Sequence, residues 1–156
     1  MTSTSKSRSK DRSEGGLSAA EQAAVKERAA EVRAEGRRGT GKAAAAERDL
    51  LAKIAAMPQP DRGLAERVHA LVTAAAPDLA PKLWYGQPAY AGAGGKVVCF
   101  FRSGQADGVR YSTFGFNDEA RLDADGGFWP TSFAVTAELD EAAEADISAL
   151  VRRAVS

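Results

Sequence analysis

The position of the aromatic residues constrains the fold of this chain more than any other feature of its sequence. All eleven Phe, Trp and Tyr residues fall between Trp84 and Phe133. Aromatic side chains bury the largest apolar area per residue, so we expect the centre of the hydrophobic core in this part of the chain. Residues 1–45 are instead rich in Ser, Ala, Lys, Arg and Glu, and such a segment cannot build a core of its own.

Charge and composition divide the chain into two predicted parts. Residues 1–48 carry eleven Lys and Arg against seven Asp and Glu, although the whole chain is neutral. We predict a disordered basic tail with a loosely attached helix in residues 1–42, the helix beginning at a capping box formed by Ser18 and Glu21. Residues 43–156 have the length of one domain, and we predict that they fold as such.

Three helices are expected within this domain. Apolar residues three and four apart indicate them at residues 43–57, 62–76 and 140–154. Asp61 is predicted to cap the second helix and Asp140 the third, because a carboxylate at that position can accept a backbone N–H. Pro77 ends the second helix.

Between the second and third helices the pattern changes to that of strands. Four are predicted, at residues 83–90, 96–102, 109–116 and 131–136. The apolar run at 97–101 is typical of a central strand covered on both faces. Short connections favour antiparallel pairing, and helices at both ends of the domain favour an α+β fold. We therefore predict a two-layer sandwich, with a mainly antiparallel sheet of about four strands packed by helices.

Several kinds of site are excluded or disfavoured. Cys99 is the only cysteine and His69 the only histidine, which excludes a disulfide framework and a cysteine-based zinc site within the chain. Cys99 lies in an apolar run and is expected to be an inert core residue. Residues 36–42 approach a phosphate-binding loop, but Ala43 replaces its Ser or Thr and no buried strand precedes it. We interpret that segment as a flexible linker, and no residue set indicates an enzyme.

No segment predicts contact with a membrane. The longest apolar run is far shorter than the ~20 residues that span a bilayer, and the N-terminus is not that of a secreted protein. We expect the protein in the cytoplasm.

The segment Pro81–Tyr90 is the strongest candidate for a binding site. It combines three aromatic rings with polar atoms, and Pro88 marks an edge or a bulge in the predicted strand. Alternation would place Tyr85 and Gln87 on one face of this strand, and neighbouring strands would complete a small pocket. The predicted ligand-binding residues are Trp84, Tyr85, Gln87, Tyr90, Arg102, Arg110 and Tyr111. The alternative is a bulged edge strand whose rings belong to the core.

Two further hypotheses concern charged groups. Carboxylates crowd the start of the last predicted helix, where they complement its dipole or bind a hard cation; the metal alternative uses Glu138, Asp140, Glu141 and Glu144. The basic tail could contact nucleic acid through phosphates, but it lacks the aromatic residues that stack on bases. A nucleic-acid partner is therefore not the leading expectation.

The Pro-x-x-x-Tyr-Gly-x-Pro-x-Tyr pattern at Pro81–Tyr90, with the strands at 96–101 and 111–116, resembles the YdhG-like domain family, which is largely of unknown function. The resemblance covers about residues 45–154 and implies a compact antiparallel sheet backed by helices. One branch of that family is described as frataxin-like iron chaperones, which would imply weakly bound ferrous iron passed to iron–sulfur assembly.

The sequence therefore predicts a small non-enzymatic accessory domain without a cofactor, which binds a small molecule or a protein partner at Pro81–Tyr90. The alternatives are a weak ferrous-iron carrier that uses surface carboxylates and a nucleic-acid-associated protein that acts through its tail.

Overall fold

The structure is a computed structural model that describes residue 22 and residues 41–156. The chain divides between Lys42 and Ala43, and residues 43–156 form one compact unit. The predicted tail, the helix predicted after Ser18 and most of the loop-like segment at 36–42 lie outside the described residues.

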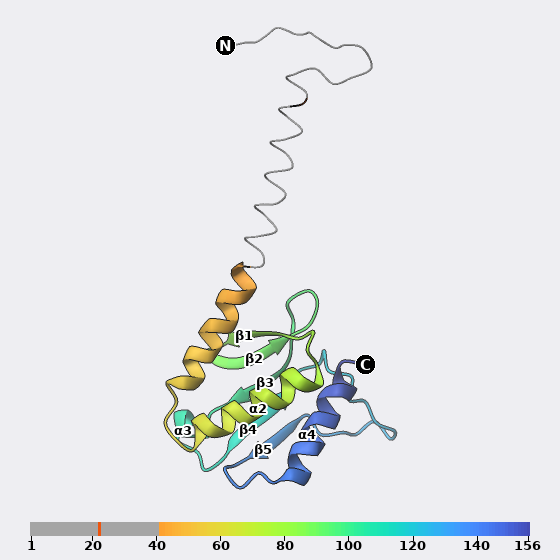
Figure 1. Ribbon diagram of the computed structural model, residues 1–156. Coiled ribbons are helices and arrows are strands. Elements are labelled where there is room, and N and C mark those ends of the chain that lie inside the picture. Colours follow the sequence, from red (N-terminus) through yellow and green to blue (C-terminus); the bar gives the residue numbers. More distant parts are fainter. Residues whose placement is uncertain (1–21, 23–40) are drawn as a thin grey trace, which may run out of the picture. The chain divides into compact units, whose positions relative to one another are not determined.

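The domain contains helices at both ends and strands between them (Figure 1). A helix occupies residues 41–55. The elements that follow are α2 (Asp61–Ala75), β1 (Ala80–Trp84), β2 (Gln87–Ala91), β3 (Val97–Arg102), α3 (Gly104–Asp107), β4 (Ser112–Phe116), β5 (Ser132–Val135) and α4 (Glu141–Ala154). This arrangement confirms the predicted α+β class.

The five strands form one antiparallel sheet in the order β1-β2-β3-β4-β5. The prediction of one strand over residues 83–90 is wrong, because Tyr85 and Gly86 form a two-residue turn between β1 and β2. The bulge expected at Pro88 falls instead between Tyr90 and Ala91. The third predicted strand begins at Ser112 rather than Val109, because α3 and a turn occupy the preceding residues.

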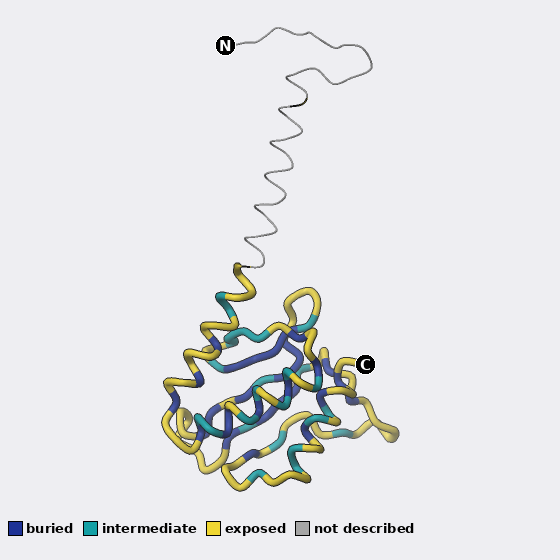
Figure 2. Tube along the Cα trace, in the orientation of Figure 1, coloured by how far each residue is buried: buried dark blue, intermediate teal, exposed yellow. Residues whose placement is uncertain are grey.

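The hydrophobic core lies between the sheet and the helices. Tyr90, Phe101 and Phe114 are fully buried, and they contact a cluster to which α2 contributes Val68 and Val72 and α4 contributes Val151. Figure 1 shows α2 and α4 side by side across one face of the sheet, and Figure 2 shows the buried positions along the inner strands and on these helices. The helix at 41–55 adds Leu50 and Ile54 to the same core.

The prediction that the apolar run in β3 is covered on both faces is wrong. Cys99 and Phe101 point into the core, whereas Phe100 between them is not part of it. Within residues 43–156 no helix covers the other face of the sheet (Figure 1), which we call the open face.

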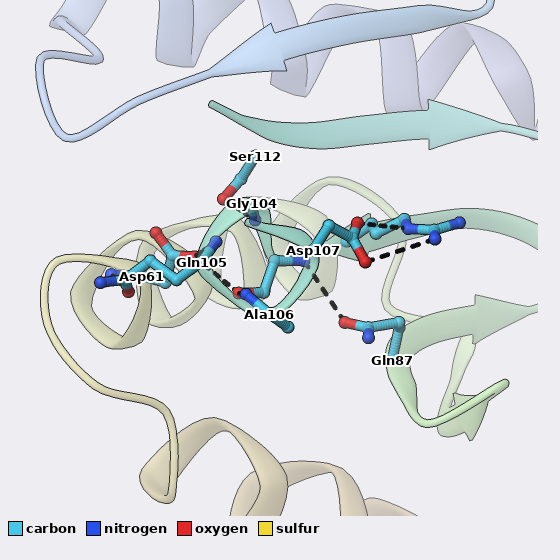
Figure 3. Close-up of polar contacts among 9 residues, drawn as sticks. Asp61, Gln87, Gly104, Gln105, Ala106, Asp107 and Ser112 are labelled. Atoms are coloured by element: carbon cyan, nitrogen blue, oxygen red, sulfur yellow. Dashed lines mark hydrogen bonds and ion pairs between the residues drawn. The ribbon is translucent and has the colours of Figure 1, made fainter. Parts of the chain in front are cut away.

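The prediction that Asp61 caps α2 is wrong, because Pro60 occupies the N-cap position. The carboxylate of Asp61 is buried and accepts hydrogen bonds from Ser103 Oγ (2.6 Å) and the Gln105 backbone N–H (3.0 Å). Gly104 N–H donates to Ser112 Oγ at 2.9 Å. Figure 3 shows these side chains converging on α3, which they fix against the start of α2.

The prediction that Asp140 caps the last helix is confirmed, because its Oδ1 accepts the Ala143 N–H at 2.9 Å. Residues 117–122 form turns and no helix. No helix in the described part of the chain is long and apolar enough to span a membrane.

Candidate functional site

The turn between β1 and β2 has an unusual residue at its first position. A two-residue hairpin loop with positive φ at both positions is a type I′ turn, and here Tyr85 has φ +50° and Gly86 has φ +75°. Positive φ is rare for bulky residues because the Cβ atom approaches the backbone. The Tyr85 side chain is also 87% exposed. The turn therefore presents an aromatic ring to solvent from a conformation that a bulky residue seldom adopts.

Trp84, Tyr85 and Phe100 form one cluster, which we call the aromatic trio. The Trp84 and Tyr85 ring centroids are 4.9 Å apart in an edge-to-face arrangement, and those of Trp84 and Phe100 are 5.3 Å apart. Neither Trp84 nor Phe100 belongs to the hydrophobic core. Both side chains are partly buried, and Tyr85 is the exposed member of the trio.

The strand register places Phe100 at the centre of a row that crosses all five strands. The paired residues in this row are Lys82, Ala89, Phe100, Gly115 and Ser132. Directly paired residues of an antiparallel sheet point to the same face. The neighbours of Phe100 are small: a Cβ atom at Gly115 would lie 2.4 Å from Phe100 Cζ. The absence of a side chain at Gly115 is thus what allows the Phe100 ring to lie across β4.

Two cations share the face of the aromatic trio. Lys82 shares its face because of the register, and Arg102 shares the face of Phe100 because it lies two residues further along β3. Arg102 Nε donates to Asp107 Oδ2 at 2.7 Å (Figure 3), and this contact raises the pKa of Arg102 above its usual range. Arg110 Cζ lies 5.3 Å from the centre of the Tyr111 ring, within the range of a cation–π contact.

Acidic residues are absent from the strand positions of the open face. Its next row contains Trp84, Gln87, Arg102, Thr113 and Ala134. The two rows together carry Lys82 and Arg102 and no Asp or Glu. Asp107, which lies in α3, forms an ion pair with Arg102.

The structure brings six of the seven predicted binding residues to one end of the sheet. Trp84, Tyr85 and Gln87 come from the hairpin, and Arg102, Arg110 and Tyr111 come from the β3–β4 connection and its border. Gln87 Oε1 accepts the Ser103 N–H at 3.3 Å and so joins these two parts (Figure 3). Tyr111 is 39% exposed.

Tyr90 is the exception, because it faces the core. It is fully buried, and its hydroxyl shares a hydrogen bond of 2.9 Å with His69 Nδ1 on α2. Burial raises the pKa of Tyr90 and lowers that of His69. The prediction failed here because the turn at Tyr85 changes which residues of the segment share a face. Cys99 is buried in the core, as was predicted, and burial raises its pKa to about 12.

Two residues of the open face were missed by the sequence analysis. Phe100 was assigned to a strand covered on both faces, and Lys82 was not considered. The alternation of β3 could have separated Phe100 from Cys99 and Phe101, but the sequence does not reveal which face the helices leave open.

Two concave sites lie outside the aromatic trio. A cavity of about 210 Å³ is lined by Gln87, Ser103 and Gln105 of α3, among other residues. A groove of about 870 Å³ lies where α2 and α4 end, with Asp78 and Arg121 in its wall beside the Lys96–Glu119 ion pair. Neither of these two contains the aromatic trio, and a pocket beside Tyr85 stays a prediction.

Two of the four acidic residues proposed to hold iron have other contacts. Asp140 caps α4, and Glu144 Oε2 lies 2.8 Å from the Arg67 guanidinium, which joins α4 to α2. In residues 41–156 no three His, Cys, Asp or Glu side chains are grouped as metal ligands. Iron binding at Glu138, Asp140, Glu141 and Glu144 stays a prediction.

No protein-family model, curated protein or solved structure matches this chain. The resemblance to the YdhG-like family likewise stays a prediction.

Proposed function

We propose that residues 43–156 form a binding module that contacts its partner through the open face of the sheet. The contact centres on the aromatic trio, at the end of the sheet where the hairpin and the β3–β4 connection meet. The module needs no catalytic group for this function.

Tyr85 carries this proposal. Asn followed by Gly is the favoured pair in a type I′ turn, because Asn tolerates positive φ. Tyr is less favourable there, and its ring is 87% exposed. Turn formation therefore does not account for a tyrosine at this position, whereas contact with a partner does.

The other two rings support the same conclusion. Phe100 and Trp84 lie partly buried on a sheet face that carries small residues at Ala89 and Gly115. Tyr and Trp are enriched at binding interfaces because they combine a large apolar surface with a polar atom. An exposed cluster of such rings, bordered by charged groups, is a common mark of an interaction site.

Tryptophan fluorescence tests the proposal. Trp129 packs against the core, so a Trp129→Phe variant leaves Trp84 as the one tryptophan of the chain. Accessibility of Trp84 to acrylamide is measured with an oligouridine, a neutral oligosaccharide and a proline-rich peptide as probes. We expect at least one probe to protect Trp84.

A Tyr85→Asn variant on this background is the matched comparison. It should keep the circular dichroism spectrum of its parent and unfold at no lower temperature, while the protection of Trp84 is lost. Unfolding of this variant would mean that the ring is structural, and lack of protection by all three probes would contradict the proposed surface.

A further inference from the structure

We infer that the partner of the open face is single-stranded nucleic acid, an inference that rests on the proposed function. Bases would stack on the aromatic trio, and phosphates would contact the cations around it.

The charges on the open face favour an anionic partner. Its two central rows contain Lys82 and Arg102 but no acid, Arg102 is paired with Asp107 of α3, and Arg110 lies in the β3–β4 connection. Lys82 and Arg110 have no ion pair with any described residue. This arrangement contrasts with the rest of residues 43–156, in which acids outnumber bases. The local excess of positive charge therefore lies on the same sheet face as the aromatic trio.

The geometry of the rings favours a partner with flat, unpaired rings. An open antiparallel sheet with exposed aromatic residues on its inner strands can stack two or three bases, and stacking is insensitive to sequence because every base has a π-face. Phe100 lies on β3, the middle strand, and Trp84 lies 5.3 Å from it. The partners of Phe100 in its row, Ala89 and Gly115, have small or no side chains.

Duplexes and acidic polysaccharides fit the same surface less well. Bases within a duplex are stacked on each other, so rings on a flat sheet cannot reach their faces. A sulfated polysaccharide supplies negative charge without a π-face. The open face should therefore prefer an unstructured single strand to either of them.

Fluorescence anisotropy of a labelled oligouridine, measured with the full chain, tests the inference. The Phe100→Leu variant keeps an apolar side chain over Gly115 and removes the π-face; we expect it to weaken binding about 5- to 150-fold, the range for one stacked base. Lys82→Gln with Arg110→Gln removes two phosphate contacts. The slope of log K against log salt should become shallower by about 1.4.

Two controls separate the open face from the other cations of the chain. Arg152→Gln removes an exposed charge of α4 and should leave affinity unchanged. An unlabelled duplex and heparin should compete less well than unlabelled oligouridine.

The outcomes distinguish this inference from the proposed function. Binding that is equally strong in the Phe100→Leu and Lys82→Gln/Arg110→Gln variants would place the nucleic acid on another part of the chain and overturn the inference. Absence of oligouridine binding at ~50 mM salt would overturn it too. If the oligosaccharide or the peptide still protects Trp84, the proposed function stands and only the nucleic acid is wrong.

Discussion

Tyr85→Asn should stabilise the domain slightly, although it removes a large aromatic side chain. In a type I′ turn a non-glycine residue other than Asn or Asp costs about 1 kcal/mol through its positive φ, and Tyr85 has φ +50°. Asn relieves most of this cost. The variant also loses the edge-to-face contact with Trp84, which for an exposed pair contributes about 0.5 kcal/mol.

The net expectation is a gain of about 0.5 kcal/mol in the free energy of unfolding, or about 2 °C in Tm for a domain of this size. Urea denaturation followed by circular dichroism measures it, with Tyr85→Ala as the matched control. Alanine loses the same contact with Trp84 but keeps the cost of positive φ, so this variant should lose about 0.5 kcal/mol.

The difference between the two variants, about 1 kcal/mol, isolates the conformational cost at Tyr85. Equal stability of both variants would show that this residue is not strained. A loss of more than about 1 kcal/mol in Tyr85→Asn would mean that the ring supports the fold. Either result refutes the reasoning that assigns Tyr85 to binding.

Three further predictions concern the residues that hold the sheet and helices together. Gly115→Ala should cost about 1–3 kcal/mol in urea unfolding, because its Cβ would meet the Phe100 ring; an unchanged midpoint would contradict the described packing. Asp61→Ala should cost about 2–3 kcal/mol, and Asp61→Asn less, because Ser103 and Gln105 lose a charged acceptor; equal losses would contradict the role of that carboxylate. Burial lowers the pKa of His69 below 6.5, so in mildly acidic solution the unfolded chain binds more protons than the folded one. The stability that neutral His69 provides is therefore present above pH 6.5 and is lost as the pH falls through the folded pKa. If a His69→Gln variant lost stability with falling pH as steeply as the parent, this account would be refuted.

The helices and the fold class were predictable because their signals are local. The apolar stripes of α2 and α4 and the cap at Asp140 depend on neighbours in the sequence. The same logic placed Cys99 in the core. These are the features for which periodicity and capping chemistry agree.

The hairpin at Tyr85 was missed because Tyr-Gly is not the dipeptide that type I′ turns favour. Without the turn, alternation assigned Tyr90 to the wrong face of the sheet. Tyr85 explains both results. It obscures the turn in the sequence, and turn formation alone does not account for a tyrosine at this position.

The contacts around α3 could not be predicted for a different reason. Asp61 lies more than forty residues from Ser103 and Gln105, which donate to it. An Asp after a proline reads as a helix cap in the sequence, and its long-range partners become visible only in three dimensions.

The measurement that tests the central claim most directly is a map of backbone amide NMR shifts during titration of the full chain with oligouridine. We predict that the shifted resonances cluster at Lys82–Tyr85, Phe100, Arg102 and Thr113, together with the Trp84 indole N–H. Shifts confined to the groove around Asp78 and Arg121, or to residues 1–40, would contradict the assignment of the open face as the binding surface.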